Sequence, residues 1–207
     1  MGTRHLIAVV HNKQIKVAQY GQWDGYLEGQ GRVVVEFIQN DLDIEKFRKA
    51  VSECQFLSDK EIKETWTECG ADPNSELVSM DIADKHTRKY AALSRDTGAK
   101  VLSLIQDKGA RALMNSIDFA ADSLFCEYAY VLDLDTETLE IYRGFNKSPV
   151  PAGERFAEVQ PHVPEHYKTA GKTYEYYPVR LLTTMKFADA TVRNLNKLIE
   201  KLNKEEE

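Results

Sequence analysis

Residues 20–31 read "YGQWDGYLEGQG" and place four glycines, two tyrosines and a tryptophan around one aspartate. The residues before this segment alternate between apolar and polar types, as in a strand, and those after it carry apolar side chains at helical spacing. Glycine permits backbone conformations and close approaches that a Cβ would prevent. The segment therefore predicts a strand-to-helix junction. It is either a tight turn covered by aromatic side chains or a cradle for a flat, negatively charged ligand.

The alternation in "RHLIAVVHNKQIKVAQY" predicts a β-hairpin at the start of the chain. A three-residue loop at 11–13 would pair Val9 with Ile15 and set His5 opposite Gln19 on the buried face. Both polar side chains would then lie where the apolar face meets the glycine-rich segment. They are either ligand-facing groups or two polar groups whose hydrogen bonds are satisfied at the edge of the sheet.

The rest of the chain predicts an α+β fold in a single domain spanning residues 1–207. Apolar residues at three- and four-residue spacing indicate a helical middle over 42–110, including a capping box that begins at Ser58. Strand patterns return further along the chain, followed by a proline-containing loop and a final amphipathic helix. We expect an antiparallel sheet covered by helices, with strands at 126–132 and 138–143, a long loop at 146–172, a strand near 173–184 and a helix from 188.

Composition argues against several classes of partner. A net charge of −6 and a pI near 5.5 do not provide the basic footprint of a nonspecific nucleic-acid-binding protein. No apolar run is long enough to cross a bilayer, so we expect no membrane association. The three cysteines are widely spaced, which favours reduced thiols in a cytoplasmic protein. Whether the chain forms a homo-oligomer is left open.

Neither a metal nor a cofactor is expected. The histidines His162 and His166 have the spacing of a helical metal pair, but Pro161 and Pro164 break the helix that such a pair needs. The glycine-rich segment also lacks the spacing of a dinucleotide-binding loop and the lysine of a phosphate-binding loop.

The glycine-rich segment is the first candidate binding site. Backbone amides at a helix start are unpaired and favour an anion, which points to Gly29, Gln30 and Gly31. Aromatic faces can stack on a nucleobase, and polar side chains can read hydroxyl or amine groups. Arg95, next to the start of another predicted helix, suits phosphate recognition. The predicted ligand-binding residues are His5, Gln19, Tyr20, Gln22, Trp23, Asp24, Tyr26, Gly29, Gln30, Gly31, Arg95 and Asp122.

A catalytic alternative uses the acidic residues of "NSIDFAADSLFCEYAY". Asp118 and Asp122 share a face if the stretch is helical, and Glu127 follows. Burying an unpaired carboxylate is expensive, so these residues either pair with an arginine or line a pocket where they act as acid or base. No nucleophile elbow or Ser-His-Asp pattern is present in the sequence, and no catalytic residue is assigned.

Three stretches resemble a family of small accessory proteins encoded by tailed phages and prophages. They are "MGTRHLIAVVHNKQIKVAQYGQWDGYLEGQG", "LSRDTGAKVL" and "IDFAADSLFCEYAYVLDLDTETLEIYRGFNK". The resemblance extends from residue 1 to about residue 147. The family contributes no activity and no functional residue to carry over to this chain.

By analogy, the resemblance implies a protein of the host bacterial cytoplasm that evades immune defence. It would sequester a small phosphorylated nucleotide signal, such as a cyclic ADP-ribose isomer or a cyclic dinucleotide. Two alternatives stay open: a nucleotide hydrolase or transferase using Asp118, Asp122 or Glu127, and a module that binds a host protein through exposed aromatic residues and the C-terminal helix.

Overall fold

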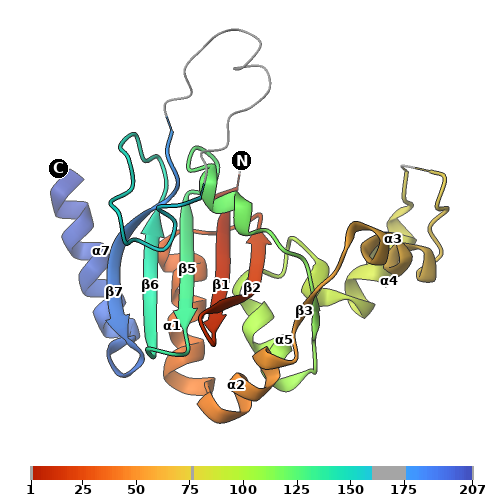
Figure 1. Cartoon of the computed structure of the whole chain (residues 1–207), viewed down its shortest axis with the longest axis horizontal. Coiled ribbons are helices and arrows are strands. Elements are labelled where there is room, and N and C mark those ends of the chain that lie inside the picture. Colours follow the sequence, from red (N-terminus) through yellow and green to blue (C-terminus); the bar gives the residue numbers. More distant parts are fainter. Residues whose placement is uncertain (1, 76, 160–175, 207) are drawn as a thin grey trace, which may run out of the picture.

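The computed structural model describes residues 2–75, 77–159 and 176–206. A five-stranded sheet in the order β2–β1–β5–β6–β7 forms its centre (Figure 1). The strands β1 and β5 pair in parallel, and the other neighbouring strands of this sheet pair antiparallel. This arrangement confirms the α+β class with a mostly antiparallel sheet. The strands are β1 (His5–His11), β2 (Gln14–Gly21), β5 (Tyr128–Asp133), β6 (Thr138–Arg143) and β7 (Arg180–Lys186).

Helices cover one face of this sheet (Figure 1). The alternation in β1 directs Ile7 and Val9 to that face, where they join a core with Val34, Phe47 and Ile105 from three of the helices. Spacings of three and four residues place the apolar side chains of each helix on its sheet-facing side. The helices on this face are α1 (Arg32–Glu36), α2 (Ile44–Ser52), α5 (Val101–Asp107) and α7 (Val192–Glu206).

The opposite face of the sheet carries a second, smaller core. Leu6 and Ala8 of β1 point to this side and pack with Val131, Tyr142 and Phe156. The short 3₁₀ helix Ile117–Ala121 and the segment around Phe156 contribute to the cover. Both faces of β1 and β5 are therefore buried, which explains why their sequences are almost continuously apolar.

Two helices form an arm that stands away from the sheet (Figure 1). They are α3 (Asp59–Glu68) and α4 (Met80–Lys89), and the two-stranded sheet of β3 (Gln55–Phe56) and β4 (Ala112–Leu113) lies near the base of the arm. The capping box predicted at Ser58 is present, with the Glu61 side chain accepting from the Ser58 backbone. The Trp66 indole stacks on the His86 ring at 3.7 Å and holds the two helices together.

The N-terminal hairpin forms, but its predicted loop is wrong. The turn has two residues, Asn12 and Lys13, both with positive φ, as in the turn type that suits twisted hairpins. A register irregularity at Val9 and Val10 then puts Val9 opposite Val17 and His5 opposite Gly21. One extra residue on one strand is enough to change the partner of every following pair.

The other predicted elements are found with shifted ends. The strands at 126–132 and 138–143 correspond to β5 and β6, and the last helix begins at Val192. The helix predicted to start next to Arg95 begins at Val101, because residues 94–100 form turns and a short 3₁₀ helix. Much of the predicted loop at 146–172, including His162 and His166, lies outside the described residues.

Candidate functional site

The glycine-rich segment folds over the start of β1 and encloses His5. A Cβ at Gly21 would overlap the His5 ring, and one at Gly25 would lie 2.7 Å from the His5 Cβ atom. The ring is fully buried, and neither of its nitrogens has a hydrogen-bond partner. Burial lowers the pKa of His5 to about 4, although the Thr3 backbone offsets part of this effect. His5 is therefore neutral at pH 7 and packs as part of the core.

The amides expected to bind an anion are already used within the protein. Gly29 and Gly31 donate their N–H groups to the carbonyl of Tyr26, at 3.1 and 3.3 Å. Gln30 donates to the carbonyl of Asp24 at 2.7 Å, and Asp24 adopts the left-handed conformation with φ of 56°. The expectation of unpaired amides at this helix start is wrong, because the chain curls back and satisfies them with its own carbonyls.

Residues 94–99 pack along the glycine-rich segment and fix its shape. The Gln22 amide donates to the Arg95 carbonyl at 3.0 Å, and the Ala99 amide donates to the Gln30 side chain at 2.8 Å. Gln19 is buried and donates from its side chain to the Ser94 carbonyl at 2.9 Å. The structure therefore brings together two of the stretches that the sequence analysis selected separately.

Trp23 lies at the surface of this junction. Its side chain is 49% exposed, and its indole N–H donates to Asp96 at 2.8 Å. One part of the ring packs against Gly2, where a Cβ would overlap the indole. Tyr26, on the same segment, is also exposed. Trp23 thus presents a fixed aromatic surface to solvent, as a stacking platform requires.

A cluster of polar side chains occupies the face of the sheet opposite α1. Tyr20 lies opposite Leu6 and points to that side, where its hydroxyl donates to the Gln22 side chain. Arg4 precedes His5 and so also faces this side, with its guanidinium 4.3 Å from the centre of the Phe125 ring. The Tyr20 ring packs edge-on against Phe119 at 4.9 Å.

Two arginines act on Tyr20 in this cluster. Burial raises the pKa of Tyr20. The positive charges of Arg4 and Arg95 oppose that shift, whereas the negative charge of Asp96 adds to it. Across the ranges that the structure describes, neither arginine forms an ion pair, and the Nε atom of Arg4 is buried without a hydrogen-bond partner. Two cations that have no ion-pair partner among the described residues therefore act on one phenol, which is an arrangement suited to an anionic ligand.

Arg4 is the residue that the sequence analysis missed. It does point away from His5, as the alternation requires, but Tyr20 and Gln22 point to its side as well. The predicted site is therefore divided between two faces of the sheet. His5 and Gln19 belong to the helix-covered core, and the exposed part of the site lies on the other face. The sequence pattern could have identified Arg4, because the two-residue period of a strand places Arg4 and Tyr20 on the same face as Leu6.

The acidic residues proposed for catalysis are not arranged as one set. Asp118 is exposed on the 3₁₀ helix, whereas Asp122 is buried at the end of that helix. A helix with three residues per turn separates positions four apart by about 120°, so the expected common face does not form. Glu127 is half-buried and accepts a hydrogen bond from the Arg4 backbone amide at 3.3 Å.

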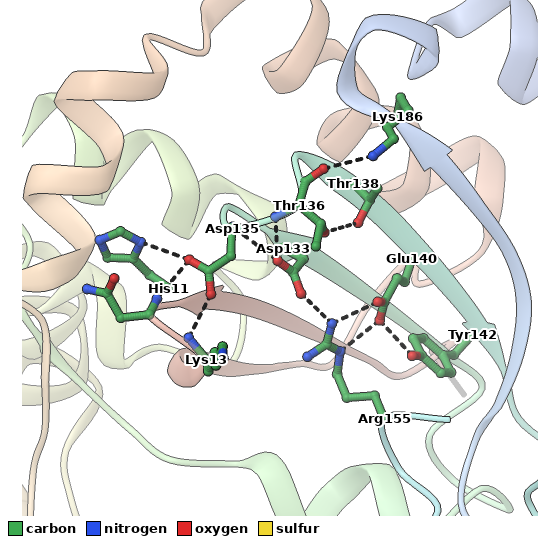
Figure 2. Close-up of polar contacts among 11 residues, drawn as sticks. His11, Lys13, Asp133, Asp135, Thr136, Thr138, Glu140, Tyr142, Arg155 and Lys186 are labelled. Carbon is green, nitrogen blue, oxygen red and sulfur yellow. Dashed lines mark hydrogen bonds and ion pairs between the residues drawn. The ribbon is translucent and has the colours of Figure 1, made fainter. Parts of the chain in front are cut away.

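A separate buried network lies where β5 meets β6 (Figure 2). Arg155 donates to both carboxylate oxygens of Glu140 and to Asp133, at 2.6 to 2.7 Å, and Tyr142 donates to Glu140. Asp133 also accepts from the Thr136 amide in the β5–β6 turn. One guanidinium bridges two carboxylates in this network, so its evident role is to hold the segment around Arg155 against the sheet.

Comparisons with known proteins identify no relative: no family model, no curated protein and no solved structure matches the chain. The resemblance to phage proteins therefore stays a prediction. Within the described residues, no helix is long and apolar enough to cross a membrane. No group of three or more histidine, cysteine or acidic side chains in that part of the chain is placed to hold a metal ion.

Proposed function

We propose that the protein binds a small phosphorylated nucleotide where β1 and β2 meet the glycine-rich segment. One observation carries this proposal: the charges of Arg4 and Arg95 both act on Tyr20, and neither arginine has a carboxylate partner in the described chain. The Arg95 backbone is bonded to Gln22, the residue before the half-exposed Trp23. Arginine pairs with phosphate oxygens through charge-assisted hydrogen bonds. An aromatic face beside it adds roughly 1–3 kcal/mol for each stacked base.

The proposal changes the roles assigned from the sequence. Arg4 and Arg95 hold phosphate in place of the Gly29–Gly31 amides, which bond within the segment. Trp23 stacks on the base, and the side chains of Asp24 and Tyr26, on the same segment, are also exposed. Three of the predicted residues have a supporting role. His5 packs beneath the glycine-rich segment, and Gln19 and Gln30 form hydrogen bonds with residues 94–99.

The biological role follows from the sequence resemblance. A phage protein of this kind would sequester a nucleotide immune signal in the host bacterial cytoplasm and withhold it from host defence. A cyclic ADP-ribose isomer and a cyclic dinucleotide both carry a base for Trp23 and phosphate for the two arginines. Binding without chemical change is sufficient for this role, and it needs no catalytic group.

Thermal unfolding with a nucleotide panel tests the proposal. A ligand at one hundred times its dissociation constant adds about 2.7 kcal/mol to the free energy of unfolding. We expect such a shift with AMP, cyclic di-AMP or cyclic ADP-ribose, and expect Arg4→Ala and Arg95→Ala to reduce it. Arg193→Ala is the matched control, because it removes an exposed arginine from α7, which lies beside β7 at the other edge of the sheet (Figure 1).

The outcomes separate the alternatives. If no nucleotide shifts the transition, or if both site variants respond like the control, the proposal is wrong. Recovery of the bound nucleotide chemically intact after heat denaturation indicates binding alone. Recovery of a cleaved product supports the hydrolase or transferase and directs attention to Asp118, Asp122 and Glu127. Capture of a host protein that depends on Trp23, without any nucleotide effect, supports the interaction module.

A further inference from the structure

Positive charge is concentrated in one part of this acidic protein. Residues 85–111 contain seven lysines and arginines and two aspartates, which gives this stretch a net charge of +5 within a chain of net charge −6. Segregation of this kind raises the local concentration of anions around the basic surface, even when the whole protein is acidic.

Two adjacent clefts open within this basic stretch. The first, of about 440 Å³, lies between the 94–97 segment and α5. The second, of about 470 Å³, lies beside residues 88–93 and shares Ala91, Leu104 and Lys108 with the first. Volumes of this size are typical of small-molecule sites.

Several of the positively charged side chains that line these clefts have no ion-pair partner among the described residues. Lys100 and Lys108 line the first cleft and Arg88 lines the second, and none of the three forms an ion pair with any described residue. Each of the two acidic residues of the first cleft has a partner, although the neutral indole does not cancel the charge of Asp96. Asp96 accepts from the Trp23 indole, and Asp107 pairs with Lys46 at 2.6 Å.

The 94–97 segment separates the first cleft from the arginine site of the proposed function. Ser94, Asp96 and Thr97 line the cleft, whereas Arg95 lies close enough to Tyr20 to act on it electrostatically. The carboxylate of Asp96 also fixes Trp23, the proposed stacking residue. Cationic side chains therefore lie on both sides of one short loop, and Trp23 is hydrogen-bonded to that loop.

We infer that the cleft lined by Lys100 and Lys108 is a second phosphate subsite, and that the ligand is a nucleotide with two phosphate groups, as in a dinucleotide. This inference rests on the proposed function. One phosphate binds at Arg4 and Arg95, and the other binds across the 94–97 segment at the two lysines. The Ser103 hydroxyl, which also lines the cleft, is a further donor to that phosphate.

Calorimetric titration with three probes tests the inference: AMP, the 5′-phosphorylated dinucleotide pApA and inorganic pyrophosphate. We expect pApA to bind about tenfold more tightly than AMP, as expected for charge-assisted hydrogen bonds to a second phosphate. Lys100→Ala with Lys108→Ala should abolish that gain and weaken the binding of pyrophosphate about tenfold, while leaving the affinity for AMP within about twofold of wild type. Lys49→Ala with Lys197→Ala removes the same charge elsewhere and is the control.

The results distinguish this inference from the proposed function. Unchanged affinity for pApA and pyrophosphate in the Lys100/Lys108 variant overturns the second subsite, even when AMP binds at the arginines. Pyrophosphate binding that requires the two lysines, together with no binding of AMP or pApA, supports the phosphate subsite and contradicts the nucleotide proposal. If the control variant loses as much affinity for pApA and pyrophosphate as the Lys100/Lys108 variant does, the effect is a general one of charge and the inference is overturned.

Discussion

The indole Nε1 of Trp23 donates a 2.8 Å hydrogen bond to the carboxylate of Asp96, and so joins the glycine-rich segment to the basic stretch. Trp23 is half-exposed, which means that its orientation depends on this bond and on its packing against Gly2. The pair links the stacking platform to the loop between the two proposed phosphate sites. The Trp23–Asp96 hydrogen bond therefore contributes to binding by holding the indole in position.

Loss of the Asp96 carboxylate should free the Trp23 ring. We expect Asp96→Ala to lower the fluorescence anisotropy of Trp23, measured in a Trp66→Phe background, and to weaken AMP binding about threefold, as for a hydrogen bond of modest net strength. Asp96→Asn retains a hydrogen-bond acceptor, so the anisotropy of Trp23 and the affinity for AMP should stay close to their wild-type values. An unchanged anisotropy in Asp96→Ala would show that packing alone orients the indole.

The sequence predicted the elements better than their contacts. Apolar periodicity located β5, β6 and α2 because burial of one face is a local property of the pattern. It failed at the hairpin register, because the irregularity at Val9 and Val10 depends on how the strands pair. The occupied amides of Gly29 and Gly31 were missed for a similar reason, since their acceptor, the carbonyl of Tyr26, is set by a local fold without a periodic signal.

Burial of His5 should make the protein less stable in mild acid. The pKa of His5 is lowered to about 4 in the folded state, mainly by burial, and is about 6.5 in the unfolded chain. Above pH 6.5 the ring is neutral in both states, so it contributes no pH dependence. Between pH 6.5 and 4 the unfolded state binds the proton, and stability falls by up to about 3 kcal/mol.

Denaturant titrations of wild type and His5→Asn from pH 4 to 8 measure this effect. In the His5→Asn variant, the free energy of unfolding should depend much less on pH between pH 4 and 6.5, whatever the absolute stability of the variant. A residual slope of the same sign is expected from His86, whose pKa is also lowered by burial. Parallel curves for the two proteins would show that His5 is not the titrating group.

Gly21 is expected to tolerate no side chain while His5 is present. A Cβ at this position overlaps the His5 ring, so Gly21→Ala should cost about 2–3 kcal/mol of unfolding free energy. Gly109→Ala is the control for backbone strain alone, because its φ is 73° and no atom lies within 4 Å of the added methyl. That change should cost about 1–2 kcal/mol.

A second substitution tests the cause. In the double variant His5→Ala with Gly21→Ala, the methyl group enters the space left by the ring, so the two effects should be less than additive by about 1 kcal/mol or more. Strict additivity in urea unfolding would mean that the overlap with His5 is relieved in some other way.

Arg155 should be the most sensitive ion-pairing residue among those described. Its guanidinium makes three hydrogen bonds to the largely buried carboxylates of Asp133 and Glu140 (Figure 2). Arg155→Ala leaves both carboxylates without their cationic partner and should cost about 3–5 kcal/mol. Arg32→Ala, which breaks an exposed pair with Glu36, should cost less than about 1 kcal/mol.

Acid titration provides an independent check on the same network. Burial alone would raise the pKa of Asp133, but the hydrogen bonds from Arg155 and Thr136 outweigh it and leave the pKa below its ordinary value. The stabilisation from Asp133 is therefore present above the unfolded pKa of about 3.9 and is lost as the pH falls through the lower folded value. We expect Arg155→Ala to be less sensitive to acid than wild type in urea unfolding below pH 4, because the group that depresses this pKa is gone. An equal acid sensitivity in both proteins would mean that Arg155 does not stabilise the charged form of Asp133, and that the segment around Arg155 is held to the sheet by the apolar contacts of Phe156 instead.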